Sequence, residues 1–301
     1  MIELKNEHLA ICVAEMGAEL QSVKDSQGRE YMWQAGEKWP RHSPILFPIV
    51  CSVNNDTYTV DGREYHLPRH GFARDTMFTV TSHTADKVTL ALHESEESLK
   101  VYPYCFNLAV TYRLEDNRIH VIWHVENTDR REIHFQIGGH PAFNVPGGKL
   151  EGQIKLDNTE PMDVLKSYID GSHDMVEEPL EADLGVIELC DNFFRNDSVK
   201  IHKCQTHRAM LMDTNGQPAV TVDYKTPVCA PLISPSRNPL LRWTSRASSV
   251  AAKAVVSAST LAGWRSLVVE WSIPMCSSSV ASTPRNTRAT PSVWASSASP
   301  T

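Results

Sequence analysis

The sequence lacks several features that would place it in a specialised class of protein. It contains no run approaching the roughly 18 apolar residues that span a bilayer. Its first residues lack the charged-then-apolar layout of a secretory signal peptide. The net charge of −7 argues against a general binder of nucleic acid or of anionic membranes. We therefore expect a protein with neither a nucleic-acid partner nor a membrane partner.

Complete sets of metal ligands and disulfide pairs are also missing. The seven cysteines form no Cys-x-x-Cys pair and their number is odd, which favours free buried thiols in a reducing compartment. His66 and His70 have a ligand spacing only in a helix, and Leu67-Pro68 between them disfavours a helix. His120 and His124 fit two surface histidines of one strand better than a metal pair. We expect a cytoplasmic protein with no metal and no other cofactor.

Helical periodicity is scarce in residues 1–228, where the one helix candidate runs from about Glu94 to Tyr102. Short alternating runs separated by turns are abundant, and Arg118 to Val125 is an example. Tyr58 to Tyr65 predicts a hairpin, because Asp61-Gly62 stands at its centre. Strands at regular spacing with few helices predict an all-β sandwich or barrel, and 301 residues suffice for a sizeable core.

Residues 229–301 differ sharply from the rest of the chain. They contain no aspartate, tyrosine or phenylalanine and one glutamate, Glu270, whereas residues 1–228 hold 35 acidic residues. Their 17 serines and seven basic residues give a net charge of +6 against −13 for the body. A disordered basic tail, a tail that binds an acidic partner, and a segment translated out of frame are three interpretations. Leu261 to Pro274, rich in Trp and Val, fits simple disorder poorly. We divide the chain into a β-sandwich domain, 1–228, and a Ser/Ala/Arg-rich segment, 229–301.

Two histidines stand at glycine-marked ends of predicted strands. Gly138-Gly139-His140-Pro141 follows a strand-like run, and Pro68-Arg69-His70-Gly71 has the same character. Because an unperturbed imidazole has a pKa near 6.5, both protonation states are accessible at neutral pH. These histidines predict a site that transfers protons. For His140 the alternative is a strand-end histidine bonded to a backbone carbonyl.

Four segments resemble the aldose 1-epimerase (galactose mutarotase-like) family, and its LacX branch most of all. They stand in the family's order within residues 1–228, and the two histidine segments together make the resemblance specific. The segments are Trp39 to Val50, Leu67 to Arg74, Gly139 to Asn144 and, more weakly, Leu189 to Phe194.

The resemblance implies a galactose mutarotase-like β-supersandwich that interconverts the α and β anomers of a free or phosphorylated hexose. It makes His140 the acid that faces the ring oxygen, and it makes His70 a hydrogen-bonding partner near the same oxygen. Arg41 and Arg74 become candidates to bind sugar hydroxyls or a phosphate, with a salt bridge as the alternative. Asp191 becomes a second type of hydroxyl partner, with an ordinary turn aspartate as its alternative. Trp33, Trp39 and Trp123 could stack on a sugar, although core packing is the commoner use of tryptophan.

Two features depart from the family pattern. The family's base is a glutamate on a late strand, yet residues 240–250 contain no carboxylate, and Glu270 lies too late with neighbours that do not match. Cys51-Ser52 stands where the branch usually has Gly-Arg. We therefore expect a weak mutarotase whose sandwich lacks partner strands near its C-terminal end, or alternatively a non-catalytic carbohydrate-binding β domain. The family interpretation requires the rings of His70 and His140 to meet.

Overall fold

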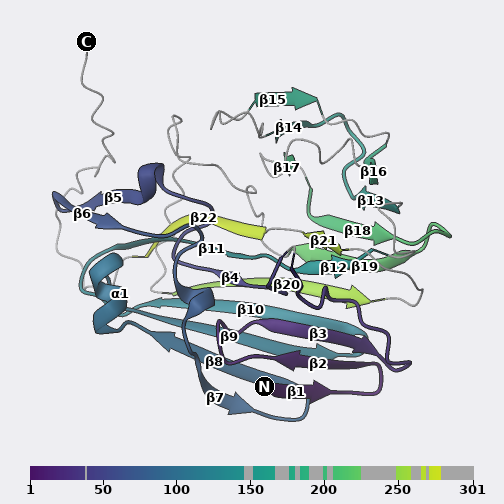
Figure 1. Cartoon of the computed structure of the whole chain (residues 1–301), viewed down its shortest axis with the longest axis horizontal. Helices are drawn as coiled ribbons and strands as arrows, with labels where there is room; N and C mark the ends of the chain where they lie inside the picture. The colour runs from purple at the N-terminus through teal and green to yellow at the C-terminus, as the bar shows by residue number, and fades with distance from the viewer. Residues whose placement is uncertain are drawn as a thin grey trace.

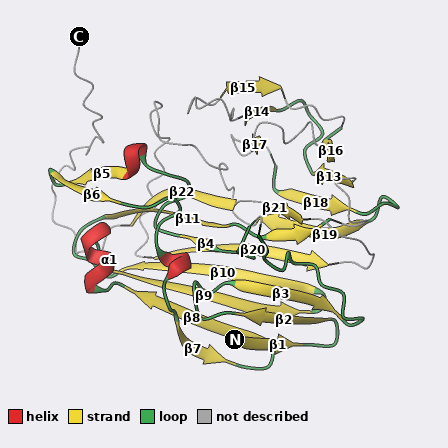
Figure 2. Ribbon diagram, in the orientation of Figure 1, coloured by secondary structure: helices red, strands yellow, loops and turns green. Residues whose placement is uncertain are grey.

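The computed structural model is built almost entirely of strands (Figures 1 and 2). Among the described residues there is one α-helix, α1 (Glu96–Val101), with two short 3₁₀ turns, η1 (Asn54–Asp56) and η2 (Ala73–Asp75). No helix in this part of the chain has both the length and the apolar character needed to cross a bilayer. The described residues are 1–37, 39–145, 152–166, 176–179, 184–189, 199–201, 206–224, 249–258, 266–268 and 271–278.

A nine-stranded antiparallel sheet forms the main layer. Two of its longest strands, β9 (Phe106–Glu115) and β10 (Arg118–Asn127), largely alternate buried and partly exposed residues, and a two-residue turn at Asp116-Asn117 joins them. Asp116 has φ +52°, a left-handed conformation that aspartate tolerates in such turns. In spatial order the strands are β16 (Val186–Leu189), β13 (Gly152–Leu156), β18 (Arg208–Met212), β19 (Pro218–Tyr224), β20 (Ser249–Ala258), β10 (Arg118–Asn127), β9 (Phe106–Glu115), β8 (Lys87–His93) and β7 (Thr79–His83).

A three-stranded sheet from the N-terminus packs against this layer. Its strands are β1 (Ile2–Lys5), β2 (Leu9–Val13) and β3 (Leu20–Asp25). Buried side chains from both sheets, among them Leu4, Ile11, Phe106 and Tyr112, belong to one hydrophobic cluster. The Tyr112 hydroxyl crosses the interface and donates a 2.7 Å hydrogen bond to the Ala18 carbonyl. This packing of sheet on sheet is the all-β sandwich that the sequence predicts.

Smaller sheets complete the fold around β11, the strand that leads to Gly139. β11 pairs with β4 on one side and β22 on the other, and β12 pairs with β21. A separate hairpin is formed by β5 and β6, and a further sheet has the order β15-β14-β17. Their bounds are β4 (Ile45–Leu46), β5 (Thr57–Val60), β6 (Arg63–His66), β11 (Ile133–Gly139), β12 (Ala142–Asn144), β14 (Asp163–Lys166), β15 (Val176–Pro179), β17 (Val199–Ile201), β21 (Ser266–Val268) and β22 (Trp271–Ser278).

Three strands of the described part of the chain come from the segment beyond residue 228. β20 lies between β10 and β19, β21 pairs with β12, and β22 pairs with β11. The sequence predicts that the sandwich would lack partner strands in this region, whereas the backbone of the segment occupies these ladder positions.

Several local predictions are confirmed and one is wrong. The helix candidate is α1, where the Ser95 side chain caps the first turn, and the Asp61-Gly62 hairpin is β5–β6. His120, expected on the surface, is only 5% exposed, and its Nε2 lies 2.7 Å from Glu115 Oε2. The reason is that both faces of β10 are covered at this point, since its neighbours in sequence, Ile119 and Val121, are buried as well.

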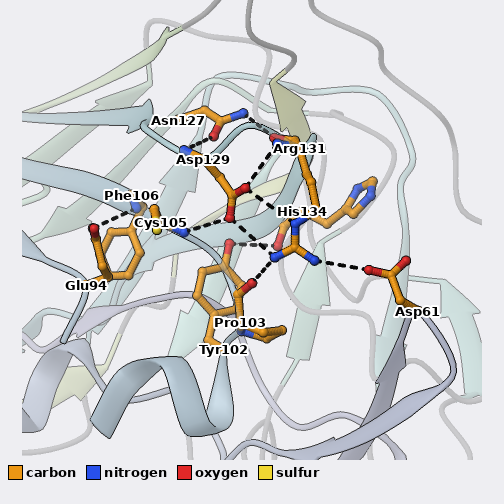
Figure 3. A network of polar contacts seen from close by, with 10 residues as sticks. All are labelled: Asp61, Glu94, Tyr102, Pro103, Cys105, Phe106, Asn127, Asp129, Arg131 and His134. Carbon is orange, nitrogen blue, oxygen red and sulfur yellow. Dashed lines mark hydrogen bonds and ion pairs between the residues drawn. The ribbon is translucent and has the colours of Figure 1, made fainter. Parts of the chain in front are cut away.

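A polar network joins the β5–β6 hairpin to the connection between β10 and β11 (Figure 3). The Asp129 carboxylate accepts hydrogen bonds from the Cys105 N–H at 3.1 Å and from Arg131, whose guanidinium also reaches Asp61 at 3.1 Å. Burial raises the pKa of Asp129, but these hydrogen bonds outweigh it and hold the pKa below its ordinary value. The hairpin precedes the His70 segment and β11 ends next to His140, so the network links the two parts of the chain that lead to the histidines.

Candidate active site

The segment that carries His140 begins where β11 ends. Gly139 pairs with Ile45 of β4, and a Cβ on Gly139 would lie 3.1 Å from the Trp123 ring, so the position favours glycine. The His140 N–H donates to the Pro44 carbonyl at 3.0 Å, and the Ala142 N–H donates to the His42 carbonyl at 2.8 Å. The backbone around His140 is therefore hydrogen-bonded on both sides of Pro141, which fixes where the imidazole emerges.

The second histidine segment depends on two consecutive left-handed residues. His70 and Gly71 both have φ +69°, and a Cβ on Gly71 would lie 2.2 Å from the Phe47 carbonyl oxygen. That oxygen accepts hydrogen bonds from the N–H groups of Phe72 and Ala73 at 3.1 and 3.2 Å. The glycine lets the chain turn tightly against β4 and present His70 beside it.

The two imidazoles meet, as the family interpretation requires. Their ring centroids are 5.9 Å apart and their planes are inclined by 73°. His70 is 6% exposed and His140 is half-buried. Two residues 70 positions apart in sequence therefore form one pair. His140 also contacts Trp39, and the centroids of these two rings are 5.2 Å apart.

Backbone contacts determine which nitrogen of His70 carries the hydrogen. The Cys51 N–H donates to His70 Nδ1 at 3.1 Å, while the Arg69 Nε–H approaches His70 Nε2 at 3.3 Å. A neutral imidazole has one lone pair for such contacts. The backbone N–H cannot rotate away, whereas the exposed Arg69 side chain can, so Nδ1 accepts and Nε2 carries the hydrogen. His70 can thus donate from Nε2 to a bound molecule.

Both histidines have a lowered pKa. Burial, followed by the charges of Arg74 and Arg69, lowers the pKa of His70 to about 3. Burial lowers the pKa of His140 to about 4, with Arg69 and Arg74 contributing and its own backbone hydrogen bond opposing. The expectation from an ordinary pKa near 6.5 is wrong for this pair, because at pH 7 only about one His140 in a thousand is protonated.

Three guanidiniums surround the histidine pair. Arg41 donates to Asp75 at 2.8 Å, and Arg74 lies 3.4 Å from the same carboxylate and donates to the Arg69 carbonyl at 2.8 Å. Arg69 is a residue that the sequence analysis missed, although its position next to His70 was a signal. For Arg41 the structure has the salt bridge that was its alternative. One carboxylate against three guanidiniums leaves a net positive charge beside the histidines.

Other residues singled out by sequence have different outcomes. Asp191 and Glu270 lie outside the described residues. Cys51 has φ +63°, a left-handed conformation, which gives a physical reason for a glycine at this position in the branch. Among the described residues there is no cluster of three or more His, Cys, Asp or Glu side chains that could hold a metal ion.

Comparison with known proteins agrees with this geometry. The family model for aldose 1-epimerase matches residues 1–228. The chain belongs to the aldose 1-epimerase family. The chromosomal LacX protein of Lactococcus lactis subsp. lactis is 32% identical over 236 residues, covering 74% of this chain and 79% of LacX.

Solved structures of aldose 1-epimerase relatives share the fold. A galactose mutarotase related enzyme from Lactobacillus acidophilus superposes with a TM-score of 0.70 and 25% identity, over 87% of this chain and 98% of that one. Galactose 1-epimerase from Lactobacillus acidophilus NCFM gives a TM-score of 0.55 and 14% identity, over 85% and 92% of the two chains, a likeness of fold alone. The predicted family, its LacX branch and the galactose mutarotase-like all-β fold are confirmed. Family membership supports a mutarotase-like isomerase that acts on a sugar.

Proposed function

We propose that this aldose 1-epimerase relative interconverts the α and β anomers of a hexose, with His140 and His70 as its proton-handling pair. The observation that carries the proposal is that the ring centroids of the two imidazoles lie 5.9 Å apart, with His70 on a turn that needs Gly71 and His140 directly after Gly139, where a Cβ would crowd Trp123. The two rings can address one oxygen atom from different directions.

The reaction needs one proton delivered and one removed. His140 gives a proton to the ring oxygen while the C1 hydroxyl loses one, so the bond between C1 and the ring oxygen breaks and an aldehyde forms. Rotation about C1–C2 and reversal of the same proton transfers close the ring on the other face. His70 donates a hydrogen bond from Nε2 near the ring oxygen and stabilises charge there.

Removal of the C1 hydroxyl proton is the weak step in this proposal. Residues 240–250 hold no carboxylate, so we assign the base role to water. Loss of one positioned acid or base typically costs about 10²- to 10⁴-fold in rate.

We retain the division of the chain at residue 228 as part of the proposal, since the family match also ends there.

A phosphorylated hexose fits the charge of the site better than a neutral one. Arg41, Arg69 and Arg74 contribute three positive charges against Asp75, and guanidiniums bind phosphate through paired N–H groups. A nearby dianion also favours the protonated form of an imidazole. A phosphate would therefore raise the pKa of His140 and supply the acid that is scarce in the free protein.

Substitution of Arg69 and Arg74 by glutamine tests whether these arginines bind the phosphate of the sugar. We expect kcat/KM for glucose 6-phosphate to fall about 10- to 100-fold in the double variant, because two charge-assisted contacts are lost, while glucose is affected less. The measurement is the rate of anomer exchange above the uncatalysed rate of each sugar. Arg113→Gln is the matched control, since that guanidinium pairs with Glu115. An equal fall in kcat/KM for glucose 6-phosphate and for glucose would contradict the proposal that these arginines bind a phosphate.

Polarimetry on freshly dissolved α-glucose, α-galactose and α-glucose 6-phosphate tests the activity itself. We expect turnover above the buffer rate but about 10²- to 10⁴-fold below that of the Lactobacillus acidophilus galactose 1-epimerase, because the base is water. A rate equal to that of this enzyme would contradict the assignment of water as the base. Sugar binding without any acceleration would favour a non-catalytic carbohydrate-binding domain, to which the lack of a carboxylate in residues 240–250 also points.

The proposal includes a cytoplasmic location. Cys12 and Cys105 are free thiols, and such thiols persist in a reducing compartment.

A further inference from the structure

Trp39 lies in a short loop that is bonded to the same backbone as His140. Gly36 and Trp39 exchange backbone hydrogen bonds of 3.1 and 3.0 Å, closing the loop. The Trp33 N–H donates to the Ala142 carbonyl at 2.9 Å, and Met32 forms a bridge with Phe143. These contacts attach the loop to the backbone segment that carries His140.

The indole of Trp33 holds the far end of this loop. Its Nε1–H donates to the Trp39 carbonyl at 2.9 Å, and its ring would lie 3.1 Å from a Cβ on Gly36. Trp33 thus fills the inside of the loop and fixes the backbone of Trp39. One tryptophan supports the loop, and the other projects toward the histidine.

His140 is held by two ring contacts of different geometry. The Trp39 ring is tilted against it, with centroids 5.2 Å apart and planes inclined by 32°. The His70 ring meets it at 73° and 5.9 Å. A rotation of the imidazole about its Cβ–Cγ bond would break both arrangements, so the two rings together define its plane.

We propose that Trp39 is a positioning residue for His140, which holds the imidazole plane toward His70 and shields one face from water. This inference rests on the proposed function, in which His140 delivers the proton. It assigns Trp39 to the histidine and not to stacking on the sugar.

The shielding has a consequence for the titration of His140. Burial is the largest cause of its lowered pKa, while the charged groups that face it, Arg69 and Arg74, are the smaller causes. His70 faces it as a neutral ring at pH 7, and Arg41 acts on His70. Removing the indole admits water and leaves these charges in place, so the pKa of His140 should rise toward its ordinary value.

NMR titration of the histidine rings in the full-length protein, without sugar, tests this inference. The His140 signals are assigned by their absence in His140→Gln. We expect the His140 midpoint to rise by about one pH unit or more in Trp39→Leu and in Trp39→Ala, and to stay within a few tenths in Trp39→Phe, which keeps a ring. Trp39→Leu keeps bulk and serves if Trp39→Ala unfolds.

A kinetic measurement separates positioning from sugar stacking. With the sugar that the wild type converts fastest, we expect Trp39→Leu to lower kcat about 10- to 100-fold with little change in KM, because the displacement of the proton donor outweighs the roughly tenfold larger protonated fraction that a one-unit rise in the His140 pKa gives. An unchanged His140 midpoint together with a raised KM would overturn the inference in favour of a sugar platform. The titration does not depend on turnover. A protein without mutarotase activity would therefore contradict the proposed function, whereas a shifted His140 midpoint would still support the positioning role of Trp39.

Discussion

Replacing His140 with glutamine is expected to slow anomer exchange by about 10²- to 10⁴-fold, the usual loss when one positioned proton donor is removed. Glutamine keeps a hydrogen-bonding side chain of similar reach but cannot deliver a proton. The backbone bond from residue 140 to the Pro44 carbonyl is retained, so the segment should keep its path. The rate is measured by polarimetry with the best substrate of the wild type.

His66→Gln is the matched control for this variant. His66 is exposed on the β5–β6 hairpin, where its Nε2 lies 3.8 Å from a carboxylate oxygen of Glu64. It should change the rate less than twofold, because surface substitutions away from a site have small effects. A His140→Gln protein that binds sugar and keeps more than half of the wild-type rate would contradict the assigned role.

The second large effect is on stability. Gly71→Ala is expected to lower the free energy of unfolding by about 3–5 kcal/mol, because it combines a left-handed residue with a steric conflict. Its Cβ would lie 2.2 Å from the Phe47 carbonyl oxygen, an atom of the backbone that two other N–H groups already bind. The strand β4 or the His70 turn must shift. Urea denaturation measures the change.

Gly62→Ala supplies the control, since Gly62 has φ +79° but a Cβ there would meet no atom within 4 Å. We expect it to cost about 1 kcal/mol, the conformational penalty alone. Similar losses for the two variants would show that crowding against Phe47 is unimportant.

The fold of the body could be predicted because its local signals agree. Asp61-Gly62 determined the hairpin, alternation determined β9 and β10, and the scarcity of helical periodicity determined the all-β class. The prediction for His120 failed because alternation along one strand does not reveal where both of its faces are covered, as they are at Ile119, His120 and Val121. β12 to β19 were not predicted individually, since such short strands carry little periodic signal.

The site was predictable in its residues more than in its chemistry. His70 and His140 were found through glycines and motifs, and the structure brings them together. Their low pKa values could not be read from the sequence, because burial and the placement of Arg69 and Arg74 depend on the tertiary fold. Trp39 begins one of the family-like segments, but nothing in the sequence indicates its contact with His140, which depends on backbone hydrogen bonds between Gly36 and Trp39.

The position of β22 has a consequence for any shortened form of this chain. β22 and β20 lie in the part of the sequence that the family match leaves out, yet they flank β11 and β10. A protein cut after residue 228 would expose open hydrogen-bonding edges on both strands. Such edges are templates for pairing with another chain, so the fragment defined by homology alone would be prone to self-association beside the imidazole that it carries.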